Sequence, residues 1–351
     1  MDFKLDAVEP PFEEVYENFF LQYGTTPLRN TNATVLEIKD LPLVDLGPLV
    51  GGDEEDRERC KREIVEASKE WGFFQVINHG IPNTILEDMN KEQVKAFREP
   101  FKKKVNDNYL DIALPKGSYR WGTPSPTRLE QLSWSEAFQI PLTGLANCDN
   151  SDIDCNFKRD NNLTPIVKQF ATTVSELALK LANILDENLG HNEGSSTIRE
   201  ICLPSTSYLR MNRYPPCPKY FGLTGLVSHT DSDFLTILYQ DQVGGLQLVK
   251  DGKWIEVKPN PNTLIVNIGD LFQAWSNGVY RSVEHRVVAN KEVERLSIAF
   301  FLNPTYDAII ESSKKPQIYK KLTLGEYKHQ IQQDTLTTGG KVGLSRFLLT
   351  S

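Results

Sequence analysis

Two histidines and one aspartate in this chain have the types and spacing of a metal site. One residue separates His229 from Asp231, and His285 follows Asp231 by 285 − 231 = 54 positions. Two imidazoles and one carboxylate can occupy one face of an octahedral iron(II) ion and leave the opposite face open to other ligands. A strand would present His229 and Asp231 on the same side, because alternate residues share a face. A single His-x-Asp pair is common by chance, so the hypothesis depends on further signals.

Arg295 and Ser297 are the second signal. A keto acid that chelates iron through its keto oxygen and near carboxylate needs a buried cation for its far carboxylate, and a guanidinium can bind that group with two parallel hydrogen bonds. Ser297 would lie on the same strand face and add a hydroxyl donor. A surface salt bridge from Arg295 to Glu292 or Glu294 is the alternative. The apolar run at 298–302 favours burial instead, and a buried arginine needs an anion.

Asn212 and Tyr214 form a third candidate pair, because they stand two positions apart and would share one face of a strand. A buried tyrosine hydroxyl must find a hydrogen-bond partner, and a bound organic ligand could supply it. Pro215 and Pro216 end the strand directly after Tyr214. On composition alone, an ordinary strand end followed by a proline-rich loop is the simpler interpretation.

The elements that must hold these residues fall into three parts of one catalytic unit. We expect a helical and mixed N-terminal layer over 1–205, a β core over 206–303 and a helical C-terminal cap over 304–351. The helices should brace the outer face of one sheet. Short apolar or alternating runs separated by turns fill the middle part, which is typical of a sandwich or barrel. The expected strands there are 208–214, 234–239, 246–249, 254–257, 264–268, 280–289 and 296–302.

The N-terminal part is less regular. Residues 1–40 are expected to have no regular structure, because prolines and asparagines interrupt every pattern. Apolar periodicity and turn residues then predict a strand at 41–46, a helix at 54–70, a buried strand at 73–77, a helix from Pro82 to about 105, and a long helix between Pro165 and Gly190.

Composition limits the classes of function. The chain has 351 residues, 39% hydrophobic and 25% charged, as in soluble globular proteins. Its formal net charge is 39 − 47 = −8 and no basic stripe is present, which argues against a nucleic-acid partner. No run approaches the roughly 20 apolar residues that span a bilayer, and the first residues lack the features of a secretory signal.

Five cysteines without CxxC spacing indicate a reducing compartment. We therefore expect the cytoplasm, with the nucleus as a second location. Cys148 and Cys155 lie close together in the polar stretch 147–162, which is expected to be a surface loop. No second pair of ligands completes a four-ligand metal site with them.

Four segments resemble the motifs of plant iron(II)/2-oxoglutarate dioxygenases, and the likeness extends from about residue 41 to 303. The segments are 71–80 (WGFFQVINHG), 229–238 (HTDSDFLTIL), 241–247 (DQVGGLQ) and 282–287 (SVEHRV). The resemblance implies a mainly β fold with flanking helices and a double-stranded β-helix (jelly-roll) core, with the metal between its two sheets. His79 in the first segment would then be structural.

The same resemblance implies roles for the candidate residues. His229, Asp231 and His285 would bind iron(II). Arg295 and Ser297 would hold the far carboxylate of 2-oxoglutarate. Asn212 and Tyr214 would hydrogen-bond its iron-proximal end. Dioxygen would be the second cosubstrate and ascorbate the reductant.

The substrate is indicated by three further segments, which resemble gibberellin 2-oxidases, most closely the subgroup acting on twenty-carbon gibberellins. They are 118–124 (SYRWGTP), 131–138 (QLSWSEAF) and 269–278 (GDLFQAWSNG). The likeness implies that the substrate is a plant hormone, a small diterpenoid carboxylic acid. Hydroxylation at its carbon 2 would deactivate the hormone. Arg120 could bind the acid while Tyr119 or Trp121 covers the rings. A solvated loop with Arg120 stacked on Trp121 is the equally supported alternative.

Three other functions stay open. One is another oxygenase of the same family, acting on a different gibberellin position, a flavonoid or another hormone. The second is a hormone-binding protein without catalysis, which would have no need of an intact triad or of Arg295 and Ser297. The third is a zinc hydrolase, which would leave the same Arg295 and Ser297 unexplained.

Overall fold

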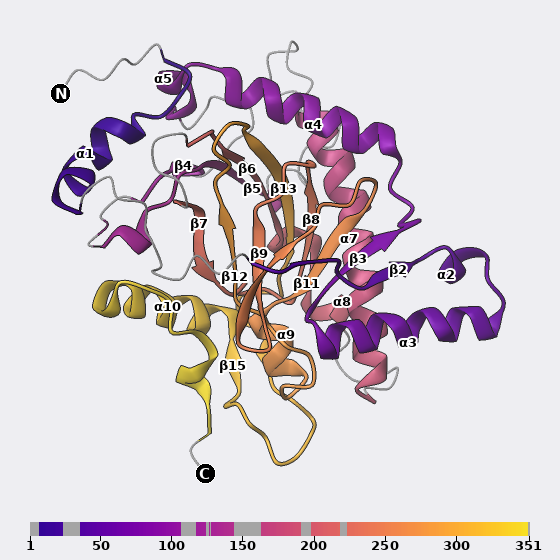
Figure 1. Cartoon of the computed structure of the whole chain (residues 1–351). Coiled ribbons are helices and arrows are strands. Elements are labelled where there is room, and N and C mark those ends of the chain that lie inside the picture. Colours follow the sequence, from indigo (N-terminus) through magenta and orange to yellow (C-terminus); the bar gives the residue numbers. More distant parts are fainter. Residues whose placement is uncertain are drawn as a thin grey trace, which may run out of the picture.

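Two large β-sheets lie at the centre of the computed structural model, and helices surround them (Figure 1). This is the expected mainly β fold with flanking helices. The structure describes residues 7–23, 36–106, 117–123, 126, 128–143, 163–190, 198–217 and 223–349. The loop predicted at 147–162, with Cys148 and Cys155, lies outside these residues. No described helix is long and apolar enough to cross a membrane.

The larger sheet has eight strands. In spatial order they are β2 (Leu43–Asp45), β3 (Phe73–Ile77), β11 (Leu264–Ile268), β8 (Leu235–Gln240), β13 (Arg295–Leu302), β6 (Tyr208–Tyr214), β5 (Glu136–Pro141) and β4 (Tyr119–Trp121). Strands β6 and β13 are antiparallel, with Tyr214 opposite Arg295 and Asn212 opposite Ser297. Opposed residues share a face, so this register places all four candidate side chains on one side of the sheet.

The smaller sheet has five strands. In spatial order they are β1 (Ile38–Lys39), β10 (Lys253–Val257), β9 (Leu246–Lys250), β12 (His285–Val288) and β7 (Thr224–His229). The pairing of β12 with β7 sets His285 directly opposite His229, and a bulge follows within β12. Two histidines that are distant in sequence therefore stand side by side. A separate hairpin pairs β14 (Ile309–Ile310) with β15 (Leu322–Thr323).

Three helices cover the outer face of the larger sheet (Figure 1): α3 (Glu54–Glu70), α4 (Asn83–Arg98) and α7 (Leu163–Asn188). Helix α3 begins where the side chain of Asp53 accepts a hydrogen bond from the backbone N–H of Asp56 (2.9 Å). Its stripe of Cys60 and Ile64 is buried in the main core together with Phe74 of β3. The helices thus brace the sheet from outside and leave its inner face for the site.

The remaining described helices are shorter or lie at the ends of the chain. They are α1 (Phe12–Tyr23), α2 (Pro48–Gly51), α5 (Phe101–Lys104), α8 (Ile198–Ile201), α9 (Asp270–Trp275), α10 (Leu324–Thr338) and the 3₁₀ turns Leu129–Gln131, Pro204–Thr206 and Gly343–Phe347. Helix α10 starts with a capping box between Thr323 and Glu326. Helices α9 and α10 lie at one end of the two sheets (Figure 1).

The prediction that residues 1–40 are irregular was wrong, because this segment contains α1 and β1. The prolines Pro10 and Pro11 precede the helix, where a missing N–H costs nothing, and so they start it. Phe12, Tyr16 and Phe20 then recur at intervals of four and are all buried. That stripe packs on an aromatic cluster, with the ring of Phe12 stacked 4.7 Å from Trp134.

The helix predicted from Pro82 to about 105 is two helices. Helix α4 ends at Arg98, and α5 starts anew at Phe101. Pro100 lies between them and forces Glu99 into an extended conformation (ψ 152°). The helix predicted at 54–70 and the strands predicted at 73–77, 208–214 and 264–268 are confirmed at those bounds.

Candidate metal and cosubstrate site

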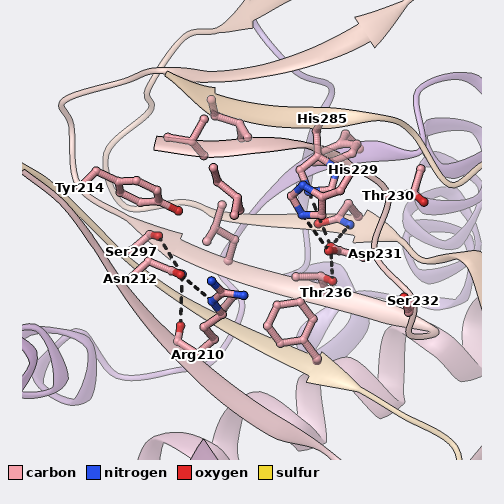
Figure 2. Close-up of a pocket in the computed structure, with 18 of the residues that line it drawn as sticks. Arg210, Asn212, Tyr214, His229, Thr230, Asp231, Ser232, Thr236, His285 and Ser297 are labelled. Atoms are coloured by element: carbon pink, nitrogen blue, oxygen red, sulfur yellow. Dashed lines mark hydrogen bonds and ion pairs between the residues drawn. The ribbon is translucent and has the colours of Figure 1, made fainter. Parts of the chain in front are cut away.

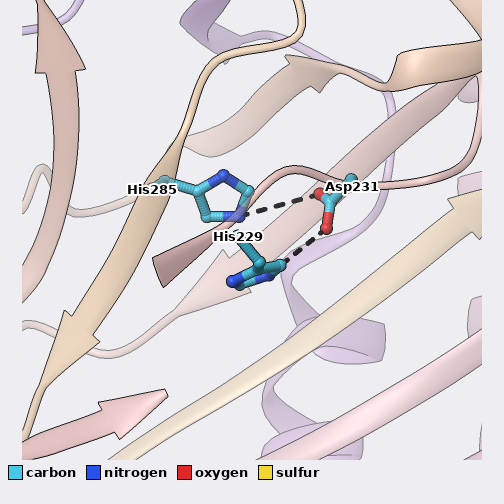
Figure 3. A group of neighbouring side chains, drawn as sticks. All are labelled: His229, Asp231 and His285. Carbon is cyan, nitrogen blue, oxygen red and sulfur yellow. Dashed lines mark ion pairs between the residues drawn. The ribbon is translucent and has the colours of Figure 1, made fainter. Parts of the chain in front are cut away.

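The structure brings His229, Asp231 and His285 together, with ligand atoms that all lie within 4.8 Å of one another (Figure 3). Nε2 of His229 is 3.6 Å from Oδ1 of Asp231, and Nε2 of His285 is 3.8 Å from Oδ2. The three side chains come from different places in the fold, and their donor atoms converge on one point. This arrangement can hold a metal ion on one side and leave the cavity side open.

Asp231 does not lie on a strand, contrary to the expectation for the His-x-Asp pair. Strand β7 ends at His229, and Asp231 belongs to the turn that follows. Its main-chain carbonyl accepts a hydrogen bond from the N–H of Asp270 (2.8 Å). Its Oδ2 accepts from Thr236 Oγ1 (2.7 Å) and from Asn267 Nδ2 (2.9 Å). Neighbouring strands, rather than strand geometry of its own, therefore aim this carboxylate.

Main-chain carbonyls hold the far nitrogen of each histidine. Nδ1 of His229 lies 2.8 Å from the oxygen of Val227, and Nδ1 of His285 lies 3.0 Å from that of Val283. A carbonyl only accepts, so each Nδ1 donates a proton to it, and Nε2 is the ring atom that faces the metal position. Burial, together with the neighbouring His229, lowers the pKa of His285 to about 4. His285 is therefore neutral at physiological pH, which is the metal-binding form.

Two buried carboxyl groups at the site, Asp231 of the triad and the nearby Asp233, differ in charge. Burial alone would raise the pKa of Asp231, but His285, His229 and the hydrogen bond from Asn267 outweigh it and hold that pKa below its usual range. Burial raises the pKa of Asp233 well above its usual range, and the charge of Asp231 raises it further. Two imidazoles and one carboxylate remain, and this donor set fits a divalent iron.

Arg295 is a buried cation on the opposite wall, 1% exposed. Its Nη2 donates to Gln240 Oε1 (2.6 Å), its Nη1 lies 3.5 Å from Ser297 Oγ, and its guanidinium lies 5.0 Å from the ring centre of Tyr214. Its Nε has no hydrogen-bond partner, and no described carboxylate forms an ion pair with it. A buried charge without a counter-ion is costly, so the site is built for an anionic ligand.

The alternative of a surface salt bridge for Arg295 is wrong. Glu294 points away and pairs with Arg213, whose Nε lies 2.8 Å from Oε2, and also with Arg98. Glu292 forms no ion pair with Arg295 within the described part of the chain. Strand alternation explains the difference, because Glu294 and Arg295 are neighbours and leave the sheet on opposite sides.

Asn212, Tyr214 and Ser297 lie beside Arg295 on the larger sheet. Asn212 Nδ2 is 3.5 Å from Ser297 Oγ. Tyr214 is 2% exposed, and Figure 2 shows its hydroxyl pointing into the space before the triad. Among the described residues this hydroxyl has no hydrogen-bond partner, so it too is available to a ligand. The four residues could thus hold the two ends of a small dicarboxylate.

One cavity of about 270 Å³ joins the triad to these four residues. Its size is close to the lower end, about 300 Å³, of pockets that bind small molecules. Its walls also include residues that the sequence did not single out, chiefly Tyr208, Arg210, Phe301 and Lys341. Tyr208 and Arg210 precede Asn212 at even spacing, so strand alternation could have found them. Lys341 has no such local signal.

Tyr119, Arg120 and Trp121 form the edge strand β4 and are not among the residues that line this cavity. The hydroxyl of Tyr119 donates to Glu136 Oε2 (2.5 Å), and the ring of Trp121 packs on Phe12 at 5.6 Å. Arg120 is exposed and donates from Nε to the oxygen of Gly117 (3.2 Å). Their role in binding substrate stays a prediction.

Known proteins are similar to this chain in both sequence and fold. Residues 205–304 match the 2OG-Fe(II) oxygenase superfamily, and residues 41–152 match the family described as non-haem dioxygenase in morphine synthesis N-terminal. Gibberellin 2-beta-dioxygenase 8 of Arabidopsis thaliana is 51% identical over 97% of this chain and 99% of its own length. Gibberellin 2-beta-dioxygenase 6 of Oryza sativa subsp. japonica is 43% identical over 97% and 96%.

Two solved structures show the same architecture. JOX2 in complex with 2OG, Fe and JA superposes with a TM-score of 0.70 at 29% identity, over 91% of this chain and 92% of that one. The dioxygenase for auxin oxidation from rice superposes with a TM-score of 0.69 at 28% identity, over 88% of this chain and 100% of its own. The jelly-roll core expected from the sequence is thereby confirmed.

Proposed function

The chain belongs to the 2-oxoglutarate- and iron(II)-dependent oxygenase superfamily, and on this basis we propose that it hydroxylates gibberellins at carbon 2 and so deactivates them. One observation carries the enzymatic part of the proposal: the unpaired, buried Arg295 faces His229, Asp231 and His285 across a single cavity. A zinc hydrolase would have no use for that cation. A protein that only binds a hormone would need neither feature.

The residues of the larger sheet would hold the cosubstrate. Arg295 would pair with the far carboxylate of 2-oxoglutarate, with Ser297 as a second donor. Tyr214 and Asn212 would donate to the end nearer the metal. Bound iron(II) supplies the redox chemistry that couples decarboxylation of 2-oxoglutarate to hydroxylation by dioxygen, with ascorbate as reductant. The residues named above would position the cosubstrate beside the metal.

The substrate carboxylate needs a cation of its own, and we assign Arg210. Among the described residues, two cations besides Arg295 line the cavity, namely Arg210 and Lys341. The ammonium of Lys341 has three N–H donors, and all three have protein partners, described below. Arg210 donates only Nε, to Asn212 Oδ1 (2.8 Å). Its two terminal nitrogens have no partner among the described residues, and Figure 2 shows them in the cavity.

Aromatic side chains next to Arg210 suit a rigid ring system. The rings of Tyr208 and Phe301 are stacked with their centres 4.5 Å apart. These two residues face each other across β6 and β13, and Tyr208 precedes Arg210 by two positions in β6. Ala299 stands opposite Arg210 and leaves room above the sheet. An apolar acid could therefore lie with its rings against this pair and its carboxylate on Arg210.

A substrate panel tests the proposed reaction. Succinate release is measured with iron(II), ascorbate and 2-oxoglutarate for gibberellins of nineteen and twenty carbons, and for a flavonoid, a jasmonate and an auxin. We expect gibberellins to stimulate release and to gain a hydroxyl at carbon 2, identified by mass spectrometry against standards. Stimulation by one of the other compounds alone would replace the gibberellin assignment.

Arg210 and Arg120 make a matched pair for the substrate carboxylate. Arg210→Met should raise KM for the free acid by about tenfold or more, because a charge-assisted hydrogen bond is worth about 1.5–3 kcal/mol. The dissociation constant of 2-oxoglutarate should stay near wild type, and a methyl ester of the substrate should remove the difference. Loss of affinity in Arg120→Met, with Arg210→Met unaffected, would move the role to Arg120.

The compartment is a separate part of the proposal. Cys60 and Cys202 are buried thiols without a disulfide among the described residues, which is compatible with a reducing environment. We therefore place the activity in the cytoplasm, with the nucleus as a second location. Fluorescent fusions of the full chain, imaged with compartment markers, test this assignment.

A further inference from the structure

The segment that follows helix α10 contributes an ammonium group to the turn that carries Asp231. Helix α10 ends at Thr338, and the left-handed conformation of the following Gly339 (φ +78°) reverses the chain. Two residues later, the side chain of Lys341 enters the cavity wall and is only 15% exposed. Its Nζ donates to the carbonyl oxygen of Thr230 (2.8 Å) and to Ser232 Oγ (3.0 Å). The ammonium therefore holds both residues that flank Asp231.

A buried carboxylate takes the third N–H of Lys341. Nζ lies 2.6 Å from Oδ2 of Asp270, a residue that is 3% exposed. The same oxygen accepts from Thr230 Oγ1 (2.9 Å) and from the hydroxyl of Tyr327 in α10. Asp270 thus links the C-terminal helix, Lys341 and the turn in one connected group.

The start of α9 holds the other side of the turn. The N–H of Asp270 donates to the oxygen of Asp231 (2.8 Å), and the N–H of Leu271 donates to that of Asp233 (3.1 Å). The approach is so close at Gly269 that an added Cβ would lie 2.1 Å from the oxygen of Asp233. The turn is therefore fixed from one side by backbone and from the other by Lys341.

We propose that Lys341 is a positioning residue that fixes residues 230–232 and, through them, the Asp231 carboxylate for metal binding. Asp231 lies beyond the end of β7, so no strand pairing restrains it. Lys341 acts on Asp231 through the flanking residues Thr230 and Ser232, and through Asp270, whose N–H donates to the main-chain oxygen of Asp231. Changes to groups that orient metal ligands typically weaken metal binding by about 10- to 100-fold. The proposal rests on the iron site of the proposed function.

The direct test is the affinity of the whole chain for cobalt(II), measured by calorimetry and by the visible absorption bands of the bound ion. Lys341→Met should weaken cobalt(II) binding by about 10- to 100-fold and alter those bands, with the circular dichroism spectrum kept. Lys341→Arg, which keeps charge and donors, should recover part of the affinity. If Lys341→Met fails to fold, Lys341→Gln replaces it and should also bind cobalt(II) more weakly than wild type. Wild-type affinity in the folded variant would overturn the proposal.

Two further variants separate positioning from other effects. Arg346→Met removes another anchor of the same segment, a contact of 3.0 Å from Nε to Asp334, which does not touch the turn. Arg346→Met should bind cobalt(II) like wild type. If it loses as much cobalt(II) affinity as Lys341→Met, then Lys341 only holds the C-terminal segment in place and has no specific role at the turn. The double variant Lys341→Met, Asp270→Asn removes both charges of this ion pair, so no buried charge is left without a partner. That double variant should stay weak, and full recovery would mean that Lys341 only neutralises Asp270. If the wild type itself does not bind cobalt(II), the metal site of the proposed function is wrong.

Discussion

Replacing Arg295 with lysine should weaken 2-oxoglutarate binding by about 10- to 100-fold. The guanidinium is buried and over the ring of Tyr214, one nitrogen is fixed by Gln240 at 2.6 Å, and Nε is free. Lysine keeps the charge but loses the planar pair of donors. A hydrogen bond to a charged group is worth about 1.5–3 kcal/mol, and each 1.4 kcal/mol is one decade in affinity. Loss of one such bond gives the stated range.

The assay is calorimetric titration of 2-oxoglutarate into manganese(II)-loaded protein, so that no turnover occurs. Arg213→Lys is the burial-matched control, because Arg213 is 2% exposed on the opposite face of the sheet and pairs with the protein's own Glu136 (2.7 Å). It should lower the thermal midpoint and leave the 2-oxoglutarate dissociation constant unchanged. If Arg295→Lys instead raises only KM for the gibberellin substrate and leaves 2-oxoglutarate binding unchanged, the role given to Arg295 is refuted.

Two predictions concern the triad. His229→Ala, Asp231→Ala and His285→Ala should each abolish turnover and lower bound iron, and normal turnover in any folded variant would remove that residue from the site. Burial lowers the pKa of His285 to about 4 from 6.5, so the unfolded chain takes up this proton first as the pH falls. The metal-free protein should therefore be fully stable above about pH 6.5 and lose up to about 3 kcal/mol towards pH 4. Urea unfolding at several pH values measures this loss, which His285→Asn should remove; a flat wild-type profile would contradict it.

The sequence predicted those helices and strands whose apolar pattern and end signals lie within the same short segment. The helix at 54–70 has one apolar stripe and an N-cap, and the strands at 73–77 and 208–214 are bounded by glycine or proline, so their bounds followed from the sequence. Helix α1 did not, because prolines that start a helix and prolines that break one look alike until the buried face is known. The same ambiguity hid the break at Pro100.

The site was predictable where its residues alternate on strands and not where it depends on contacts between distant segments. Arg295 and Ser297 share a strand face, which spacing alone indicates. Asp231 is aimed by Asn267 and Thr236 from other strands, so its position off the strand could not be foreseen. The difference between Lys341 and Arg210 emerges only when the partners of each nitrogen are counted in three dimensions.

The pairing of β6 with β13 has a consequence for how such enzymes diversify. Tyr214 and Arg295 lie opposite each other at one end, Asn212 and Ser297 follow, then Arg210 and Ala299, then Tyr208 and Phe301. Each step is about 7 Å along the strands. Mutations at the far pairs could therefore retune which molecule is accepted and leave the shared cosubstrate end intact. A one-residue shift of the β6 register would do the opposite, because it would turn the inward side chains of the whole strand outward at once. Substitution therefore changes this ladder one pair at a time, whereas a shift of register changes all pairs together.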